Sequence, residues 1–489
     1  MSKKKQGMYW LFAVLLNLSN HQALAQQDKW DLRRCVEYAY NNNISIKQAD
    51  IDARVAKLSL EQSKWSQFGQ ASFSTSMGLN FGRSINPTTN LFTTNQSLYQ
   101  NYSLQAGASL FNWFSLRRTI EANKYNYDAQ MANIDKVKSD VALNVAAAYL
   151  TALLAREQVN VSSAKLQLTK QQLDITRKMV DAGTVPELNA AELEAQFATD
   201  TSTLISAQET YGINLLQLKA FLSLDAAVPF DLDNTPVESI PLEPIAELQP
   251  DLVYSLAEKS YPLQRMNDLR FAAAQKNVGA VKGQMFPTLS IFGGLGNSFN
   301  NELRQQIVTR QPDQPTNLYA VNNVFDTSIV YTPYATQAFV KQPFSKVFTG
   351  YGTQLDNNFR QQIGLSLNVP IFNGNLARTN FQKAKLNVQT VDLQRKNDLL
   401  TLKQNIYQAY NNAVAAMQKY EANKKAVSTA VRSFDLASKR YNIGLLNTID
   451  YLTNQNNMFA QQINLLSSHY DFVFKMKVLE FYKGMGVKL

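Results

Sequence analysis

Apolar and polar residues alternate along four segments of the chain, which are 71–82, 101–111, 288–299 and 358–372. In the first segment, Phe73, Met77 and Leu79 share one face, and small or polar residues occupy the other. A period of two residues predicts β-strands. Strands of about ten residues with one apolar face and one small or polar face are typical of transmembrane β-barrels. A half-buried sheet in a soluble protein is the alternative interpretation.

Four strands are too few to close a barrel, because single-chain membrane barrels begin at about eight strands. An open sheet edge in lipid leaves backbone N–H and C=O groups without partners. If the strands lie in a membrane, several copies of the chain must therefore contribute to one barrel. The connections 83–100 and 300–357 are predicted to be extracellular loops, since barrels place their longer loops outside. The sequence leaves open whether the second loop plugs the pore mouth.

Two longer regions repeat their apolar residues at alternating spacings of four and three. Examples are Val141, Val145, Ala148 and Ala152 in the first region, and Ile406, Tyr410, Ala413 and Met417 in the second. These are heptad seams, which predict helices that pack along a narrow stripe. We therefore predict two hairpins of long antiparallel helices, over 116–222 and 376–483. A helix of roughly 66 residues is about 100 Å long, far more than a bilayer requires.

Each hairpin turns at a glycine, Gly183 in the first and Gly444 in the second. Glycine often ends a helix because it adopts the left-handed conformation at little cost. Val185 in the first tip, and Leu445 and Leu446 in the second, are predicted to face solvent. Exposed apolar residues at a loop tip indicate a partner surface. Ordinary hydrophobic staples are the alternative.

The residues after each glycine predict how the next helix begins. Thr184 to Glu187 resembles a capping box, with Pro186 in an early helical position. In the second tip, Asn447 is predicted to be the cap, with Asp450 at the third helical position.

The chain repeats its own plan of helix, strand, loop, strand, long helix, tip and long helix. The segment FNWFSLRRT at 111–119 returns as FNGNLART at 372–379. A period this long indicates an internal duplication rather than a solenoid. The predicted parts are a signal peptide at 1–25, a first repeat at 26–223, a linker at 224–250 and a second repeat at 251–489.

The first 25 residues have the order of a secretory signal peptide, with basic residues, a short apolar run and Ala23-Leu24-Ala25 before the cleavage point. Cys35 is the only cysteine, so an intrachain disulfide is excluded. The linker is rich in proline and acidic residues, and we predict an ordered or semi-ordered connection rather than a helix.

The sequence offers little material for catalysis. The net charge of +10 is scattered along the chain, so we predict no nucleic-acid binding. His469 is the only histidine after the signal peptide, and we expect it to be structural and partly buried. A Ser–His or Cys–His nucleophile pair has almost nothing to be built from, and metal-ligand spacing is absent. We therefore predict that the protein is not an enzyme and has no catalytic residue, cofactor or metal site.

The ordered set of these features resembles the TolC family of outer-membrane export and efflux channels. The resemblance covers essentially the whole mature chain, and includes the tips AGTVPELNAAELEAQ and IGLLNTIDYLTNQNN. It implies a mixed α and β fold in which a homotrimer shares one twelve-stranded barrel and the hairpins form a periplasmic tunnel. Implied partners are outer-membrane lipid, a periplasmic adaptor (membrane fusion) protein and an inner-membrane transporter, in a Gram-negative bacterium.

The resemblance also implies roles for the tips. The segment after each tip glycine contacts the adaptor in this family, and corresponds here to Gly183, Thr184, Val185, Pro186, Gly444, Leu445, Leu446 and Asn447. Asp450 matches an acidic position at the tunnel entrance, and three such carboxylates would favour cations. The next acidic gate position is Thr453 here, and the basic gate partner is replaced by Leu446. Asn189 is the equivalent of Asp450 in the first tip, although an alignment by helix caps pairs Asp450 with Glu187 instead.

The implied function is that of a passive exit duct of a tripartite efflux pump, for small toxic molecules or metal ions. Type I secretion of polypeptides is an alternative, because the same tunnel plan serves both. An exported coiled-coil structural or adhesin protein is the alternative from another class, and such a protein would not fractionate with the outer membrane.

Overall fold

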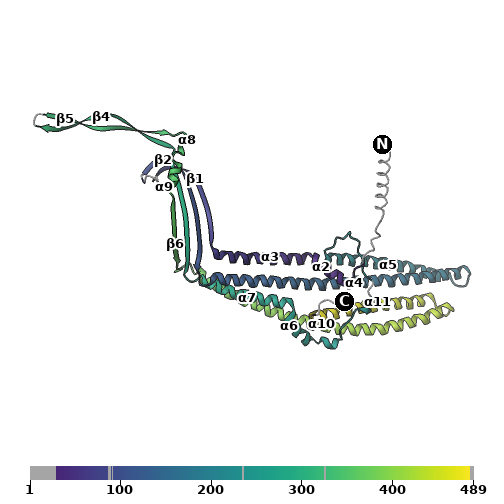
Figure 1. Ribbon diagram of the computed structural model, residues 1–489. Coiled ribbons are helices and arrows are strands. Elements are labelled where there is room, and N and C mark those ends of the chain that lie inside the picture. Colours follow the sequence, from purple (N-terminus) through teal and green to yellow (C-terminus); the bar gives the residue numbers. More distant parts are fainter. Residues whose placement is uncertain (1–28, 86–89, 91, 234–235, 324–325, 485–489) are drawn as a thin grey trace, which may run out of the picture. The chain divides into compact units, whose positions relative to one another are not determined.

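The computed structural model describes residues 29–85, 90, 92–233, 236–323 and 326–484. The predicted signal peptide therefore lies outside the described residues. The chain divides into two compact units, a helical unit (Met1–Ser59, Ala122–Gln275 and Leu386–Leu489) and a strand unit (Leu60–Glu121 and Lys276–Lys385). The divisions fall within four helices (Figure 1), which are α3 (Ile44–Trp65), α4 (Ser115–Asp181), α7 (Pro262–Gly283) and α10 (Leu376–Asn442).

The strand unit contains a four-stranded antiparallel sheet in the order β1-β2-β3-β6. The strands are β1 (Gln70–Ile85), β2 (Phe92–Phe111), β3 (Thr288–Glu302) and β6 (Arg360–Asn368). A short 3-10 turn, η2 (Ser66–Phe68), precedes β1. Phe73 lies opposite Leu104, which lies opposite Leu295, so the apolar sets of three strands share one face. β1 and β6 are the edge strands of this sheet.

The connections between the strands differ from the predicted loops. β1 and β2 remain paired up to Ile85 and Phe92, so most of the predicted loop 83–100 is strand. The region 300–357 contains β4 (Arg304–Asn323) and β5 (Asp326–Lys341), which form a separate two-stranded ribbon, then α8 (Phe344–Val347) and α9 (Tyr351–Asn357). These loop predictions were wrong because backbone pairing persists where neither strand face is consistently apolar, and the period-two signal then disappears.

The last strand is shorter than its predicted range of 358–372. It ends at Asn368, two residues before Pro370. Proline has no backbone N–H to donate to a neighbouring strand, so the alternating pattern continues past the point where pairing ends.

Two helical hairpins make up most of the helical unit. The first joins α4 to α5 (Glu187–Leu222), and the second joins α10 to α11 (Thr448–Tyr482) (Figure 1). Val145 and Ala152 of the first predicted seam, and Ile406 and Ala413 of the second, are buried. The remaining helices are α2 (Leu32–Asn42) and α6 (Pro250–Ser260), with 3-10 turns η3 (Val237–Ser239) and η4 (Ile245–Leu248).

The described residues of the segment between the two halves, 224–233 and 236–250, pack into the helical unit. Leu232 and Leu248 of this segment are fully buried. Cationic side chains hold its backbone carbonyls: Lys219 donates to Ala226 and Val228, Arg156 to Leu232 and Asp233, and Lys477 to Pro241. Buried carbonyl groups need such donors, which explains how a proline-rich segment with only short 3-10 turns can lie in a core.

By length and composition alone, one helix among the described residues is apolar enough to cross a membrane, and that helix is α4. Its buried residues Val145, Tyr149 and Leu153 belong to the largest core cluster of the helical unit, together with residues of α2, α5 and α11. Packing within the unit therefore accounts for the apolar character of α4.

Candidate functional site

Both hairpin tips end their first helix in the same way. Gly183 and Gly444 have positive φ angles of 71° and 76°. In the first tip, the N–H of Gly183 donates to the carbonyl of Val180 and that of Thr184 to Met179. In the second tip, the N–H of Gly444 donates to Tyr441, and that of Leu445 to Arg440. This is the Schellman pattern, so the predicted role of both glycines as helix terminators is confirmed.

The two tips begin their second helices differently. The Asn447 side chain accepts a hydrogen bond of 2.7 Å from the Asp450 N–H, which confirms the predicted cap. The predicted capping box at Thr184 was wrong. Pro186 is the N-cap of α5, and the Thr184 hydroxyl donates back to the carbonyl of Met179 at 2.9 Å. The Schellman turn occupies Thr184 and thus removes it from the capping position.

The apolar surface of the tips differs in part from the prediction. Leu445 is 65% exposed, but Val185 and Leu446 are only half-exposed. Leu188 in the first turn of α5 is 65% exposed, and Ile443 and Ile449 are also exposed in the second tip. These three residues were not predicted, because Leu188 and Ile449 lie inside the helix that follows each turn and Ile443 precedes the glycine. Each tip thus presents at least one large apolar side chain to solvent.

Leu446 is half-buried because it packs on a cluster that joins the two hairpins. This tip cluster consists of Leu173, Leu193, Tyr451 and Leu452, with Phe197, Phe434, Tyr441 and Leu446 packed against it. The rings of Tyr441 and Tyr451 stack at 4.6 Å. Burial raises the pKa of Tyr451 to about 12, and the neighbouring Tyr441 contributes to that shift. Helices α4, α5, α10 and α11 all contribute, so the cluster fixes one tip against the other.

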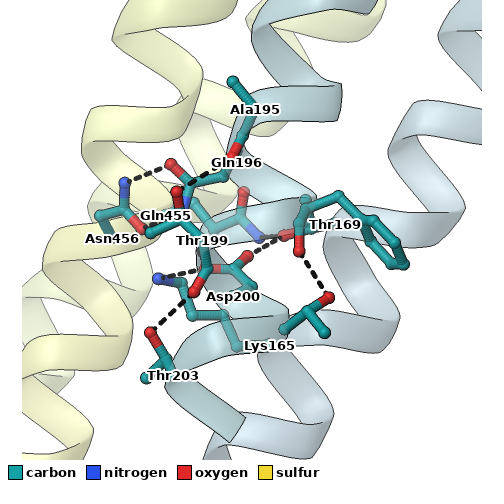
Figure 2. A network of polar contacts seen from close by, with 11 residues as sticks. Lys165, Thr169, Ala195, Gln196, Thr199, Asp200, Thr203, Gln455 and Asn456 are labelled. Carbon is teal, nitrogen blue, oxygen red and sulfur yellow. Dashed lines mark hydrogen bonds and ion pairs between the residues drawn. The ribbon is translucent and has the colours of Figure 1, made fainter. Parts of the chain in front are cut away.

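A polar network lies further along the same helices (Figure 2). Asp200 of α5 is fully buried and forms an ion pair of 2.8 Å with Lys165 of α4. The same carboxylate accepts hydrogen bonds of 2.7 Å from Thr169 and from Gln196. Three strong partners satisfy a charge that would be costly to bury alone.

The network extends from the first hairpin to the second through two residues of α11. Gln455 Nε2 donates to the Thr169 hydroxyl at 3.0 Å, and the amides of Gln196 and Asn456 exchange hydrogen bonds of 3.4 and 3.2 Å (Figure 2). Gln455 is fully buried. A shift of α11 against α4 would therefore break the hydrogen bond between buried Gln455 and Thr169, and a shift against α5 would break the half-buried amide pair of Gln196 and Asn456.

The predicted gate residues lie near the tips without direct bonds to one another among the described contacts. Asp450 is exposed in the first turn of α11, and its carbonyl accepts from Asn454. Thr453 is exposed one turn later, and its hydroxyl donates to the carbonyl of Ile449. Asn189 is half-buried in the first turn of α5.

The sheet of the strand unit has two chemically distinct faces. The polar face carries Ser72, Gln105, Ser290 and Gln362, which line a hollow of about 850 Å³. The opposite, apolar face exposes large side chains on all four strands, including Phe73, Met77, Leu104, Leu295 and Leu365. A sheet with one wet and one apolar face fits a barrel wall between an aqueous pore and lipid.

Aromatic side chains gather where the strands join the helices. Trp65 lies 5.5 Å from Phe68, Phe111 5.4 Å from Trp113, and Trp113 4.9 Å from Phe286. Most of these rings are exposed. Aromatic girdles mark the interfaces of transmembrane barrels, so this end of the sheet matches one membrane boundary.

Cys35 and His469, the residues considered for chemistry, both lie in structural surroundings. Cys35 is buried, and burial raises the pKa of its thiol to about 12. His469 stacks on Tyr420 at 4.5 Å, and its Nδ1 lies 3.5 Å from Glu238. Among the described residues, no group of three His, Cys, Asp or Glu side chains is arranged to hold a metal ion.

Residues 37–223 and 253–473 match the family model for outer membrane efflux proteins. The chain is 23% identical over 466 residues to outer membrane protein TolC of Escherichia coli (strain K12), which covers 94% of this chain and 82% of that protein. It is 22% identical over 467 residues to outer membrane efflux protein BepC of Brucella suis biovar 1 (strain 1330). This match covers 94% of this chain and 86% of BepC.

The fold is similar to that of solved channel proteins. Crystal structures of CusC superpose with a TM-score of 0.70 at 15% identity, covering 94% of this chain and 95% of that one. The Campylobacter jejuni CmeC outer membrane channel gives a TM-score of 0.68 at 18% identity, with coverage of 94% and 86%. The expected TolC-like fold is thus confirmed. The chain belongs to the outer membrane efflux protein family, whose members are transport channels of the outer membrane that extend into the periplasm.

Proposed function

We propose that the protein is the outer-membrane channel subunit of a tripartite efflux pump and works as a homotrimer. The observation that carries this proposal is the four-stranded sheet with free edges at β1 and β6 and an exposed apolar face. In lipid, free edges must be paired. Pairing β1 of one copy with β6 of the next closes a barrel from three copies.

Exposed apolar stripes on the helices support the same assembly. Ile44, Ile51 and Leu58 of α3 are exposed at intervals of seven residues. Leu386, Leu393 and Leu400 of α10 repeat this spacing and are also exposed. A sustained spacing of seven is the pattern by which helices of separate chains pack. In the proposed trimer, these two stripes are covered by neighbouring copies.

The tips are the proposed docking surface for a periplasmic adaptor protein, which links the channel to an inner-membrane transporter. Leu188 and Leu445 are exposed apolar groups on turns whose backbone is fixed by Schellman bonds and by the tip cluster. The turns that carry these groups are formed by Gly183, Thr184, Val185 and Pro186 in the first tip and by Gly444, Leu446 and Asn447 in the second. The channel itself then needs no energy source, and the transporter selects small toxic molecules or metal ions as cargo.

The mass of the detergent-solubilised protein, measured by native mass spectrometry, tests the assembly. We expect a particle of three chains. A monomer would leave the sheet edges open and would contradict the shared barrel. Export is tested in a strain that lacks the gene, where the wild type restores tolerance to small toxic compounds. The Leu188→Glu/Leu445→Glu variant should form trimers but fail to restore tolerance, and full restoration would exclude the tips as docking surface.

Asp450 is proposed as the gate residue, with Asn189 and Thr453 nearby on the entrance. Three symmetry-related Asp450 carboxylates would attract cations at a constriction. Asp450→Asn should therefore reduce the cation preference of single channels in planar bilayers while trimers persist. An unchanged cation preference would remove Asp450 from the gate. The variant keeps the Asn447 cap, because the cap uses the backbone N–H of Asp450.

A further inference from the structure

Residues 341–358, which run from the last residue of β5 towards β6, lie on the apolar face of the sheet, and we name them the rim segment. Leu98, Phe299 and Val347 form a buried cluster on that face, and Phe348 and Tyr351 pack against it. The Tyr351 hydroxyl is 2.7 Å from that of Tyr102, whose register places it on the same face as Leu104 and Leu295. The rim segment therefore covers part of the face that points away from the polar hollow.

The rim segment also provides hydrogen-bond partners for backbone groups at the exposed end of β3. β6 begins at Arg360, opposite Gly296, so β3 continues beyond it towards Glu302. There the Asn300 N–H donates to Gln354 Oε1 at 3.1 Å, and the Ser298 carbonyl accepts from Asn358 Nδ2 at 2.7 Å. Unpaired strand groups are costly in lipid, so these side-chain bonds let β3 extend past β6 at a membrane boundary.

The outward side of the rim segment combines one large apolar group with positive charge. Phe344 is 70% exposed and contacts Phe348 edge-on at 5.6 Å. Lys341 and Lys346 are exposed on either side of Phe344 in the sequence, and Asp356 in α9 is the one exposed acidic group of the segment. Aromatic rings favour the membrane interface, and lysines favour anionic headgroups.

We propose that the rim segment is an interfacial anchor for the anionic lipid surface at the end of the sheet remote from the helices. Phe344 enters the acyl layer, while Lys341 and Lys346 bind the headgroups. This inference rests on the proposed barrel, because it places the apolar face against lipid. It also means that residues 341–358 of the predicted long loop do not plug the pore, since they lie on the outer face.

Spin labels on single cysteines test the placement of Phe344. The background is Cys35→Ala, and the labelled sites are Phe344→Cys, Met77→Cys and Ser74→Cys, in vesicles of phosphatidylcholine and phosphatidylglycerol at equal amounts. Met77 and Ser74 lie on opposite faces of β1, so they serve as the lipid and pore references. Relaxation by oxygen reports lipid, and relaxation by a water-soluble nickel chelate reports water.

We expect the label at 344 to be relaxed more strongly by oxygen than by nickel, as at 77. A water-like label at 344 beside a lipid-like label at 77 would overturn the anchor and leave the proposed barrel intact. A label at 344 that neither reagent reaches would mean that another copy of the chain covers it, which also overturns the anchor. A water-like label at 77 would instead contradict the barrel and the proposed function.

The charge requirement is tested with the same label. The 344 label should lie deeper in the mixed vesicles than in pure phosphatidylcholine, and Lys341→Gln/Lys346→Gln should abolish this difference. A depth that does not depend on lipid charge would exclude headgroup binding by the two lysines. Because both lysines are exposed and lie outside the buried cluster, these substitutions should leave folding unchanged.

Discussion

At the scale of single residues, the helical unit uses buried charges as joints. Asp200, Lys477 and Glu480 are buried, and each has a charged partner. Glu480 also accepts from the Glu243 N–H at 2.9 Å, so this pair holds the inter-repeat segment. Such groups add little net stability when they are satisfied, but they strongly oppose any arrangement that separates them. We infer that the Asp200–Lys165 pair fixes the alignment of α5 against α4, and that the Lys477–Glu480 pair, which lies within α11, fixes the inter-repeat segment on that helix.

The Asp200 network gives the first prediction. Asp200→Ala should lower the free energy of unfolding by about 3 kcal/mol, because it leaves Lys165 and Thr169 without their buried partner. Thermal unfolding followed by far-UV circular dichroism measures the loss. Asp200→Ala/Lys165→Met should recover part of it. Thr203→Ala is the control, since the Thr203 hydroxyl bonds only to a carbonyl of its own helix and should change little. If Asp200→Ala and Thr203→Ala lowered the free energy of unfolding equally, the Asp200 network would not have the proposed role.

His469 gives a prediction about pH. Burial lowers the pKa of His469, Glu238 opposes this shift, and Lys424 reinforces it. The unfolded chain has the ordinary histidine pKa of about 6.5 and so binds the proton more readily. The stability gained from a neutral His469 is therefore fully present above about pH 6.5, and is lost as the pH falls through the lower pKa of the folded state.

The measurement is the melting temperature at about pH 7.5 and about pH 5 for the wild type and for His469→Gln. Wild-type stability should fall more steeply on acidification than that of the variant, because the variant lacks the titrating imidazole. Parallel curves would show that protonation of His469 is not linked to folding. The comparison removes the contribution of the carboxylates, which both proteins share.

At the scale of elements, the sequence predicts regular structure where a pattern has one buried stripe or one apolar face. The seams through Val145 and Ile406 and the glycine turns are of this kind. The β4–β5 ribbon has no such pattern, because its strands pair without an apolar face. Similarly, the exposure of Leu188 and the burial of Leu446 follow from how two hairpins meet at the tip cluster. Contacts between segments far apart in the sequence determine the exposure of Leu188 and the burial of Leu446. The local pattern of apolar residues does not predict such contacts.

The tip glycines allow an element-scale test. Gly444→Ala should lower the free energy of unfolding by about 1 kcal/mol, because alanine at a φ of +76° is strained. Gly212→Ala is the matched control. Gly212 lies inside α5, and an added methyl group there meets nothing within 4 Å. It should stabilise the protein by up to about 1 kcal/mol, since alanine favours helix. Destabilisation by both changes would mean that φ does not decide the effect at Gly444.

At the scale of the whole molecule, the described chain leaves apolar surface exposed in an ordered way. The stripes on α3 and α10 keep a spacing of seven residues, and the sheet keeps most of its exposed large side chains on one face, with Phe292 as an exception on the polar face. Scattered exposed apolar residues are normal on a protein surface, but aligned ones indicate a partner. Lipid accounts for the sheet face. Helix α10 has 67 residues and extends well beyond the length of a bilayer, so another protein surface is needed to cover its stripe. Copies of the same chain supply that surface in the proposed trimer.

Charge placed on a stripe should therefore prevent assembly without unfolding the single chain. Leu393→Lys puts an unpaired charge into the proposed interface, where burial without a partner is costly. We expect native mass spectrometry of the detergent extract to show a larger fraction of monomers for this variant than for the wild type. Asn387→Lys adds the same charge to an exposed position of α10 outside the stripe and should leave the trimer intact. Trimers of equal stability in both variants would place the α10 stripe outside the interface, and the helices of neighbouring copies would then have to meet along another face.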